Sequence, residues 1–129
     1  MKFITSLVTF TFLSLISVTL PVRSKTTNSC IEGAKKTSDP LPQIIALGRA
    51  KNVARQAAQV VNSGIEKYRP EDVMHGQVTK APCTDNGDGT WTFNFQGMVP
   101  GGSVPIRNTT VTIDSKTFDV KIDRNTVLK

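Results

Sequence analysis

The chain has 129 residues, of which 16 are basic and 10 acidic, and its formal net charge is +6. This length suits one domain with a modest core and excludes a chain of several domains. The basic residues are scattered along the sequence, so no nucleic-acid binding is predicted, because that function needs Lys and Arg gathered on one face.

The first 24 residues have the pattern of a secretory signal peptide. Lys2 precedes an uncharged run from residue 3 to residue 20, and Pro21 ends any helix there. Ser24 provides the small residue typical of a cleavage site. We predict a signal peptide at residues 1–24, cleavage near Ser24, and export to the periplasm or the extracellular space. An uncleaved membrane anchor is the alternative, although seven Ser and Thr residues dilute the 18-residue run.

Cleavage leaves 105 residues with 14 basic and 10 acidic side chains, a net charge of +4. This excess favours weak attraction to anionic surfaces. No membrane span is expected in this part. Cys30 and Cys83 both lie in it, and an even number of Cys in an exported chain predicts one disulfide. Free thiols or metal ligands are the alternative, but the chain has one His and no Cys-x-x-Cys pair. We predict no metal and no cofactor.

A polar stretch and then a long helix are predicted next. Residues 25–38 are polar, and we expect an extended arm held at Cys30. Asp39 and Pro40 form a helix start, apolar residues recur with helical period over residues 41–63, and Gly64 ends the helix. Most residues of the apolar arc are Ala, which favours a core face over a lipid face. The arc consists of Ala46, Leu47, Ala50, Val53, Ala54, Ala57, Ala58, Val60 and Val61, and Lys51, Arg55 and Gln56 are among the residues on the other side.

The rest of the chain has the period of strands. Residues 77–81 are a short candidate strand, and residues 85–89 form a turn rich in Asn-Gly and Asp-Gly. Trp91, Phe93 and Phe95 point to one face of the next strand. Residues 104–113 form a longer strand, whose Pro105 marks an edge or a bulge. The last strand contains Phe118, Val120 and Ile122 alternating with polar residues.

These elements predict the α+β class. We expect a single domain over residues 39–129, in which one long N-terminal helix packs across an antiparallel meander of about four strands. The large residues of the sheet would face the small residues of the helix.

Few residues suggest chemistry. His75 follows Glu71 and Asp72, so an acid–base pair is conceivable, but no nucleophile accompanies it. We therefore predict no catalytic residues. Asp85 begins a loop that has Gly at the third and fifth positions of a calcium loop, so a turn is favoured over a calcium site. Residues 97–102 are Gly-rich but precede a strand, not the helix N-terminus of a phosphate site. Asn108 begins a glycosylation tripeptide.

The order of a helix followed by a meander, over residues 40–123, resembles the cystatin-like architecture and PepSY-type domains. The Gln-x-Val-x-Gly motif of cystatin inhibitors is not matched, because residues 59–64 contain one residue too many, and Trp91 follows Thr90 rather than Pro. The inhibitor residues are therefore not carried over. Residues 85–97 are also similar to uncharacterised small exported bacterial proteins, which supports export without implying an activity.

The function predicted from these observations is a non-enzymatic binding or inhibitory module outside the cytoplasm, with another protein as its expected partner. The absence of a catalytic constellation supports this class. The alternative is a small secreted enzyme or the accessory subunit of one.

Overall fold

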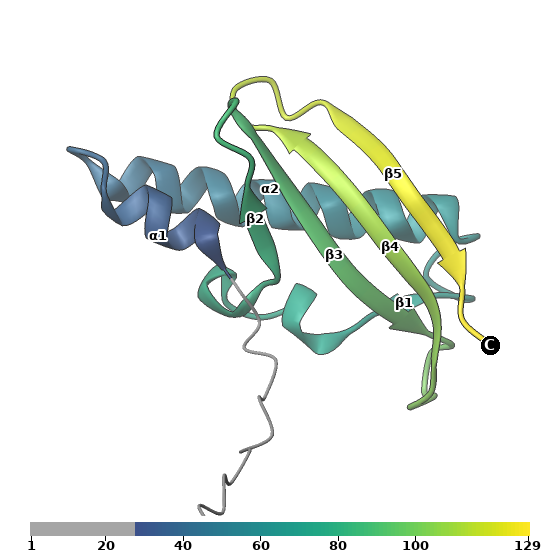
Figure 1. Cartoon of the computed structure of the whole chain (residues 1–129). Helices are drawn as coiled ribbons and strands as arrows, with labels where there is room; N and C mark the ends of the chain where they lie inside the picture. Colours follow the sequence, from purple (N-terminus) through teal and green to yellow (C-terminus); the bar gives the residue numbers. More distant parts are fainter. Residues whose placement is uncertain (1–27) are drawn as a thin grey trace, which may run out of the picture.

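The computed structural model describes residues 28–129, so the predicted signal peptide lies outside the described residues (Figure 1). A five-stranded antiparallel sheet and two α-helices make up the fold, which confirms the α+β class. The strand order is β1-β3-β4-β5, and β2 also pairs with β3. The elements are α1 (Ser29–Lys35), α2 (Pro40–Val61), β1 (Arg69–Pro70), β2 (Cys83–Asp85), β3 (Thr90–Met98), β4 (Pro105–Asp114) and β5 (Val120–Val127), with short 3-10 helices η1 (Asp72–Met74) and η2 (Val78–Lys80).

The predicted architecture is wrong in three details. The long helix α2 has 22 residues but is not the N-terminal element, because α1 precedes it. The sheet has five strands rather than about four, since β1 and β2 each add a short pairing to the same edge of β3. Residues 77–81 form no strand and instead contain η2.

Helix α1 replaces part of the extended arm predicted for residues 25–38. The Asn28 side chain caps it by accepting a hydrogen bond of 3.1 Å from the Ile31 amide. Cys30, Ile31 and Ala34 form its buried face. The predicted disulfide is present between Cys30 and Cys83, with Cα atoms 5.7 Å apart, and it fastens α1 to β2. Loop-closure entropy assigns such a link about 4 kcal/mol.

The predicted boundaries of the long helix are nearly right. Pro40 is its first residue, where the missing amide donor costs nothing, and Asp39 occupies the N-cap position without making a side-chain capping hydrogen bond. After the helix, Gly64 has a φ of +92°, and its amide donates to the Gln59 carbonyl at 2.7 Å. A glycine therefore closes the helix, as its position predicts.

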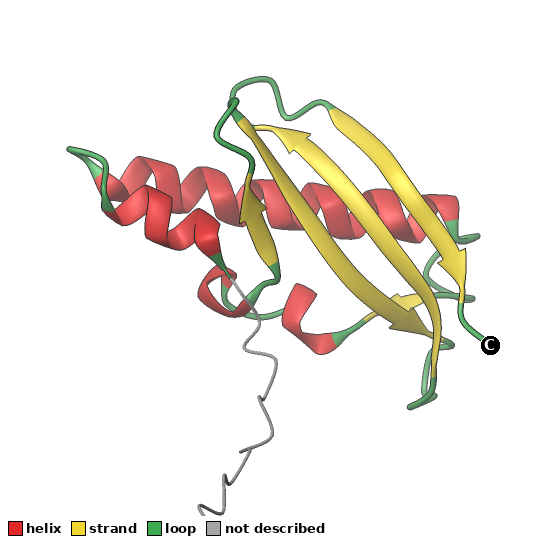
Figure 2. Ribbon diagram, in the orientation of Figure 1, coloured by secondary structure: helices red, strands yellow, loops and turns green. Residues whose placement is uncertain are grey.

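The core lies between α2 and one face of the sheet, and no described element covers the other face (Figure 2). The helix contributes mainly small side chains, which lets the strands approach it closely. The buried apolar residues of the helix are Leu47, Ala50, Ala54 and Ala58, and the buried apolar residues of the sheet are Trp91, Phe93, Phe95, Val111 and Ile113. The predicted arc is wrong at its end, where Val60 is 80% and Val61 is 47% exposed.

The last strand begins later than predicted. Phe118 precedes β5 and has a φ of +60°, which a bulky residue adopts only in a tight connection. Its ring lies 4.1 Å from the Arg49 guanidinium carbon, a cation–π contact that ties the connection to α2. Val120 is 44% exposed, so the predicted inward alternation of Phe118, Val120 and Ile122 is wrong at Val120.

The close packing of α2 leads to a testable prediction. Ala54 has no exposed surface, so Ala54→Leu should lower the free energy of unfolding by about 1–3 kcal/mol through overpacking. Gln56 is exposed on the same helix, and Gln56→Leu should change the free energy of unfolding by no more than about 0.5 kcal/mol. Urea melts of both variants provide the measurement, and equal losses would contradict the observed phase of the helix.

Candidate functional site

The three residues considered for acid–base chemistry lie in one segment, but their side chains bond to other groups and not to one another. The Nε2 atom of His75 lies 3.0 Å from the Pro70 carbonyl oxygen. Asp72 forms a 2.8 Å ion pair with Arg69, and the Glu71 carboxylate accepts a 2.9 Å hydrogen bond from the Gln96 amide. Each of the three side chains therefore has a partner elsewhere in the protein.

Two cations of α2 hold the same segment from the other side. Lys51 is 5% exposed, although its position predicted an outward side chain, and its ammonium group donates to the Gly76 carbonyl. The Arg55 guanidinium donates to the Met74 carbonyl at 3.2 Å. Burial, with a smaller contribution from Arg55, lowers the pKa of Lys51. These contacts fasten the loop after η1 to the helix.

The clearest exposed feature is the connection between β3 and β4, residues 98–105, which we call the hairpin tip. It extends past the end of the sheet in Figure 1. Within it the Gly102 amide donates to the Val99 carbonyl at 2.8 Å, and Gly101 has a φ of +79°. With Pro100 between them, these residues have the pattern of a type II turn. Val99 is 52% exposed and Val104 is 73% exposed, so the tip presents aliphatic side chains on a fixed backbone.

The base of the hairpin tip is clamped. The ring of Tyr68 lies against Gly97, and a Cβ atom at that position would overlap it. At the edge of β3, Glu71 and Gln96 form two hydrogen bonds. The main-chain amide of Glu71 donates to the main-chain carbonyl of Gln96 at 2.9 Å, and the main-chain amide of Gln96 donates to the Glu71 carboxylate. Tyr68 is 1% exposed, and burial raises its pKa. The tip therefore projects from a rigid base.

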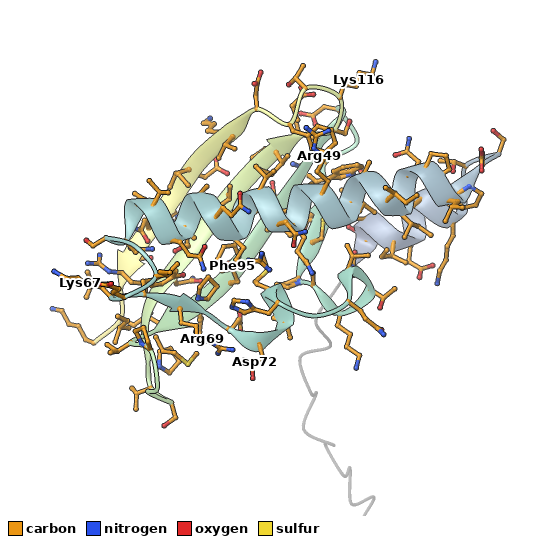
Figure 3. All side chains as sticks on the ribbon, turned by 180° about the vertical axis from the view of Figure 1, so that it is seen from behind. Arg49, Lys67, Arg69, Asp72, Phe95 and Lys116 are labelled. Carbon is orange, nitrogen blue, oxygen red and sulfur yellow. A yellow bond between two sulfur atoms is a disulfide. The ribbon has the colours of Figure 1, made fainter. Side chains whose placement is uncertain are left out.

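A shallow groove of about 430 Å³ runs beside the hairpin tip. Val73 and Met98 provide apolar surface, and the Arg69–Asp72 ion pair forms part of the rim. Figure 3 shows Arg69 and Asp72 beside each other at this end of the molecule. Groove and tip together form a candidate contact surface that combines exposed aliphatic side chains with a recess beside them.

Other candidates are smaller. The loop of Asp85 forms the predicted turn, with Gly87 and Gly89 at positive φ, and its carboxylate accepts from the Gly87 amide at 2.9 Å. A pocket of about 70 Å³ lies beside Cys30 and Trp91. Within residues 28–129 no group of three His, Cys, Asp or Glu side chains is arranged to hold a metal ion, and no helix is long and apolar enough to cross a membrane. Glycosylation of Asn108 stays a prediction.

Comparison of the chain with family models, with curated proteins and with solved structures finds no match. The resemblance to cystatin-like and PepSY-type domains therefore stays a prediction. The Gly-rich residues 97–102 were the only sequence signal at the hairpin tip. The exposure of its two valines depends on tertiary structure.

His75 gives this site a pH dependence. Partial desolvation of the largely exposed ring is the main cause that lowers its pKa, and Arg55 and Arg69 add to it, whereas the Pro70 carbonyl and Asp72 oppose it. The unfolded chain therefore binds a proton first as the pH falls below about 6.5, and stability is lost in that direction. In urea melts, the free energy of unfolding should fall further between about pH 7.5 and about pH 5 for the parent protein than for His75→Gln. Parallel curves for the two proteins would contradict this assignment.

Proposed function

We propose that the chain is exported and acts outside the cytoplasm as a non-enzymatic binding or inhibitory module, with the hairpin tip and its groove as the contact surface. The observation that carries this proposal is the aliphatic tip, in which exposed Val99 begins a turn closed by the bond from Gly102 to Val99, and exposed Val104 lies between this turn and β4. A surface fixed in advance loses little conformational entropy on binding.

The surroundings of the tip support binding rather than catalysis. The only His, His75, lies against a backbone carbonyl, and the carboxylates of Glu71 and Asp72 already hold an amide and a guanidinium. Beside these paired groups, the groove supplies shape and apolar area through Val73 and Met98.

Export is supported by the disulfide between Cys30 and Cys83, because such bonds form and persist in oxidising compartments. The uncharged run over residues 3–20 adds sequence support. If the proposal is right, the protein purified from the exported fraction begins within a few residues of Lys25. N-terminal sequencing or intact mass tests this, and an intact Met1 in membrane-bound material would restore the anchor alternative.

The contact surface can be tested before its partner is identified. A photo-reactive benzoylphenylalanine replaces Val104 in one variant and Val120 in another, in the cells that produce the protein. Both valines are exposed and lie at or just before the start of a strand, but at opposite ends of the sheet. We expect covalent adducts from position 104 and not from position 120, because only the tip is a contact surface. Adducts from both positions, or from neither, would argue against the proposed site.

A further inference from the structure

The hairpin tip is apolar and carries no charge. Its exposed apolar residues are aliphatic or Pro, and residues 98–105 contain no aromatic residue and no charged residue. Apolar side chains that project from the end of a molecule can leave water among lipid head groups.

Cationic groups lie directly behind the tip. The strand register places Arg69 opposite Met98 and Arg107 opposite Gly97. Arg107 takes part in no ion pair within the described residues. A guanidinium matches the geometry of a phosphate group with two parallel hydrogen bonds. Along the hairpin, the apolar tip is therefore followed by Arg107, whose guanidinium group is suited to binding a phosphate.

Charge also differs between the two ends of the sheet. Figure 3 shows Lys67 and Arg69 at the end that carries the tip and Arg49 and Lys116 at the other. At the far end, residues 84–91 and 112–121 contain four Asp and two Lys residues, and Arg49 lies against Phe118, which leaves one net negative charge. Around the tip, residues 66–72, 106–108 and 125–129 contain four basic and three acidic side chains, of which Asp72 is paired with Arg69. The molecule would therefore orient its tip toward an anionic surface.

We infer that the hairpin tip docks on an anionic lipid bilayer, with Val99 and Val104 inserted at the head-group level and Arg107 bound to a lipid phosphate. This inference rests on the proposed function, since it names the partner of the same contact surface. It requires no membrane span. Neither the tip nor one arginine would suffice alone, because stable peripheral binding takes an apolar and an electrostatic contribution together.

Vesicle flotation of the purified exported protein tests the inference. One set of vesicles is phosphatidylcholine alone, and in the other about a third of the lipid is phosphatidylglycerol. At low ionic strength we expect binding to the anionic vesicles only, weakened by added salt. Val104→Asp should reduce this binding by more than about tenfold, and Arg107→Gln by about fivefold, the effect expected for one cation at an anionic surface.

Two matched variants provide controls at the far end of the sheet. Val120→Asp introduces the same charge at another exposed valine, and Lys116→Gln removes one exposed cation. Both should bind anionic vesicles within about twofold of the parent protein. Thermal melts of all four variants establish that each is folded, which is expected because Val104 and Val120 are exposed.

The outcomes separate this inference from the proposed function. No binding of the parent protein to anionic vesicles, or an equal loss in Val104→Asp and Val120→Asp, would overturn the lipid inference. If position 104 then forms adducts with a protein, the proposed contact surface stands with a different partner. If neither vesicles nor adducts are found, both proposals fall.

Discussion

The fold depends on the close approach of α2 to the sheet. Ala50, Ala54 and Ala58 have no exposed surface, and Phe93 and Phe95 are buried opposite them. Because alanine adds little thickness, the aromatic rings fill the space between helix and sheet without a gap. A larger helix residue would push the strands away from α2, and the segments that pair with β3 would have to move with them.

The C-terminal half of α2 and the Asn62 cap that follows it hold the segment that packs against the base of the hairpin tip. The side-chain amide of Asn62 donates to the Ala58 carbonyl at 2.9 Å, and its side-chain oxygen accepts from Asn125 of β5 at 2.9 Å. Lys51 and Arg55 meanwhile hold the carbonyls of residues 76 and 74. Residues 62–76, the segment that contains β1, are thus fixed to α2 at both ends. That segment supplies the side chains that clamp β3 just before the tip.

Such a chain of contacts explains why an exposed loop can present a defined surface. The register between β3 and β4 shifts at Met98 and Pro105, where the tip begins, so the ladder of hydrogen bonds ends there abruptly. The Pro100–Gly101 corner then reverses the chain within a few residues. In a domain of this size, fixing the backbone before binding removes an entropic cost that an open loop would incur on contact.

Features governed by local periodicity could be read from the sequence. The alanine face of α2, the inward Trp91, Phe93 and Phe95, and the turn over residues 85–89 all follow from spacing of 3.6 or two residues or from glycine chemistry. Helix α1 was missed because it has only seven residues, although Asn28 and the spacing of Cys30, Ile31 and Ala34 are a weak signal for it. The backbone at Phe118 and the burial of Lys51 arise from tertiary contacts that no local pattern encodes.

The candidate site was less accessible to sequence reasoning than the core. Its valines are ordinary loop residues until the sheet places them at the end of the molecule, and Arg107 gains its position behind the tip only through pairing with β3. The disulfide was predictable because Cys30 and Cys83 are the only cysteines, and the export predicted from the sequence favours their pairing.

Amide hydrogen exchange, followed residue by residue with and without anionic vesicles, tests the central claim most directly. In the free protein the slowest amides should lie in the middle of α2 and in β3 and β4, since these share the core. The Gly102 amide should also be protected, because it is bonded to Val99. Vesicles should add protection at residues 98–107 and leave residues 114–120 unchanged. Unprotected, unresponsive amides at the tip, or protection gained equally at both ends of the sheet, would contradict a rigid docking tip built on the helix–sheet core.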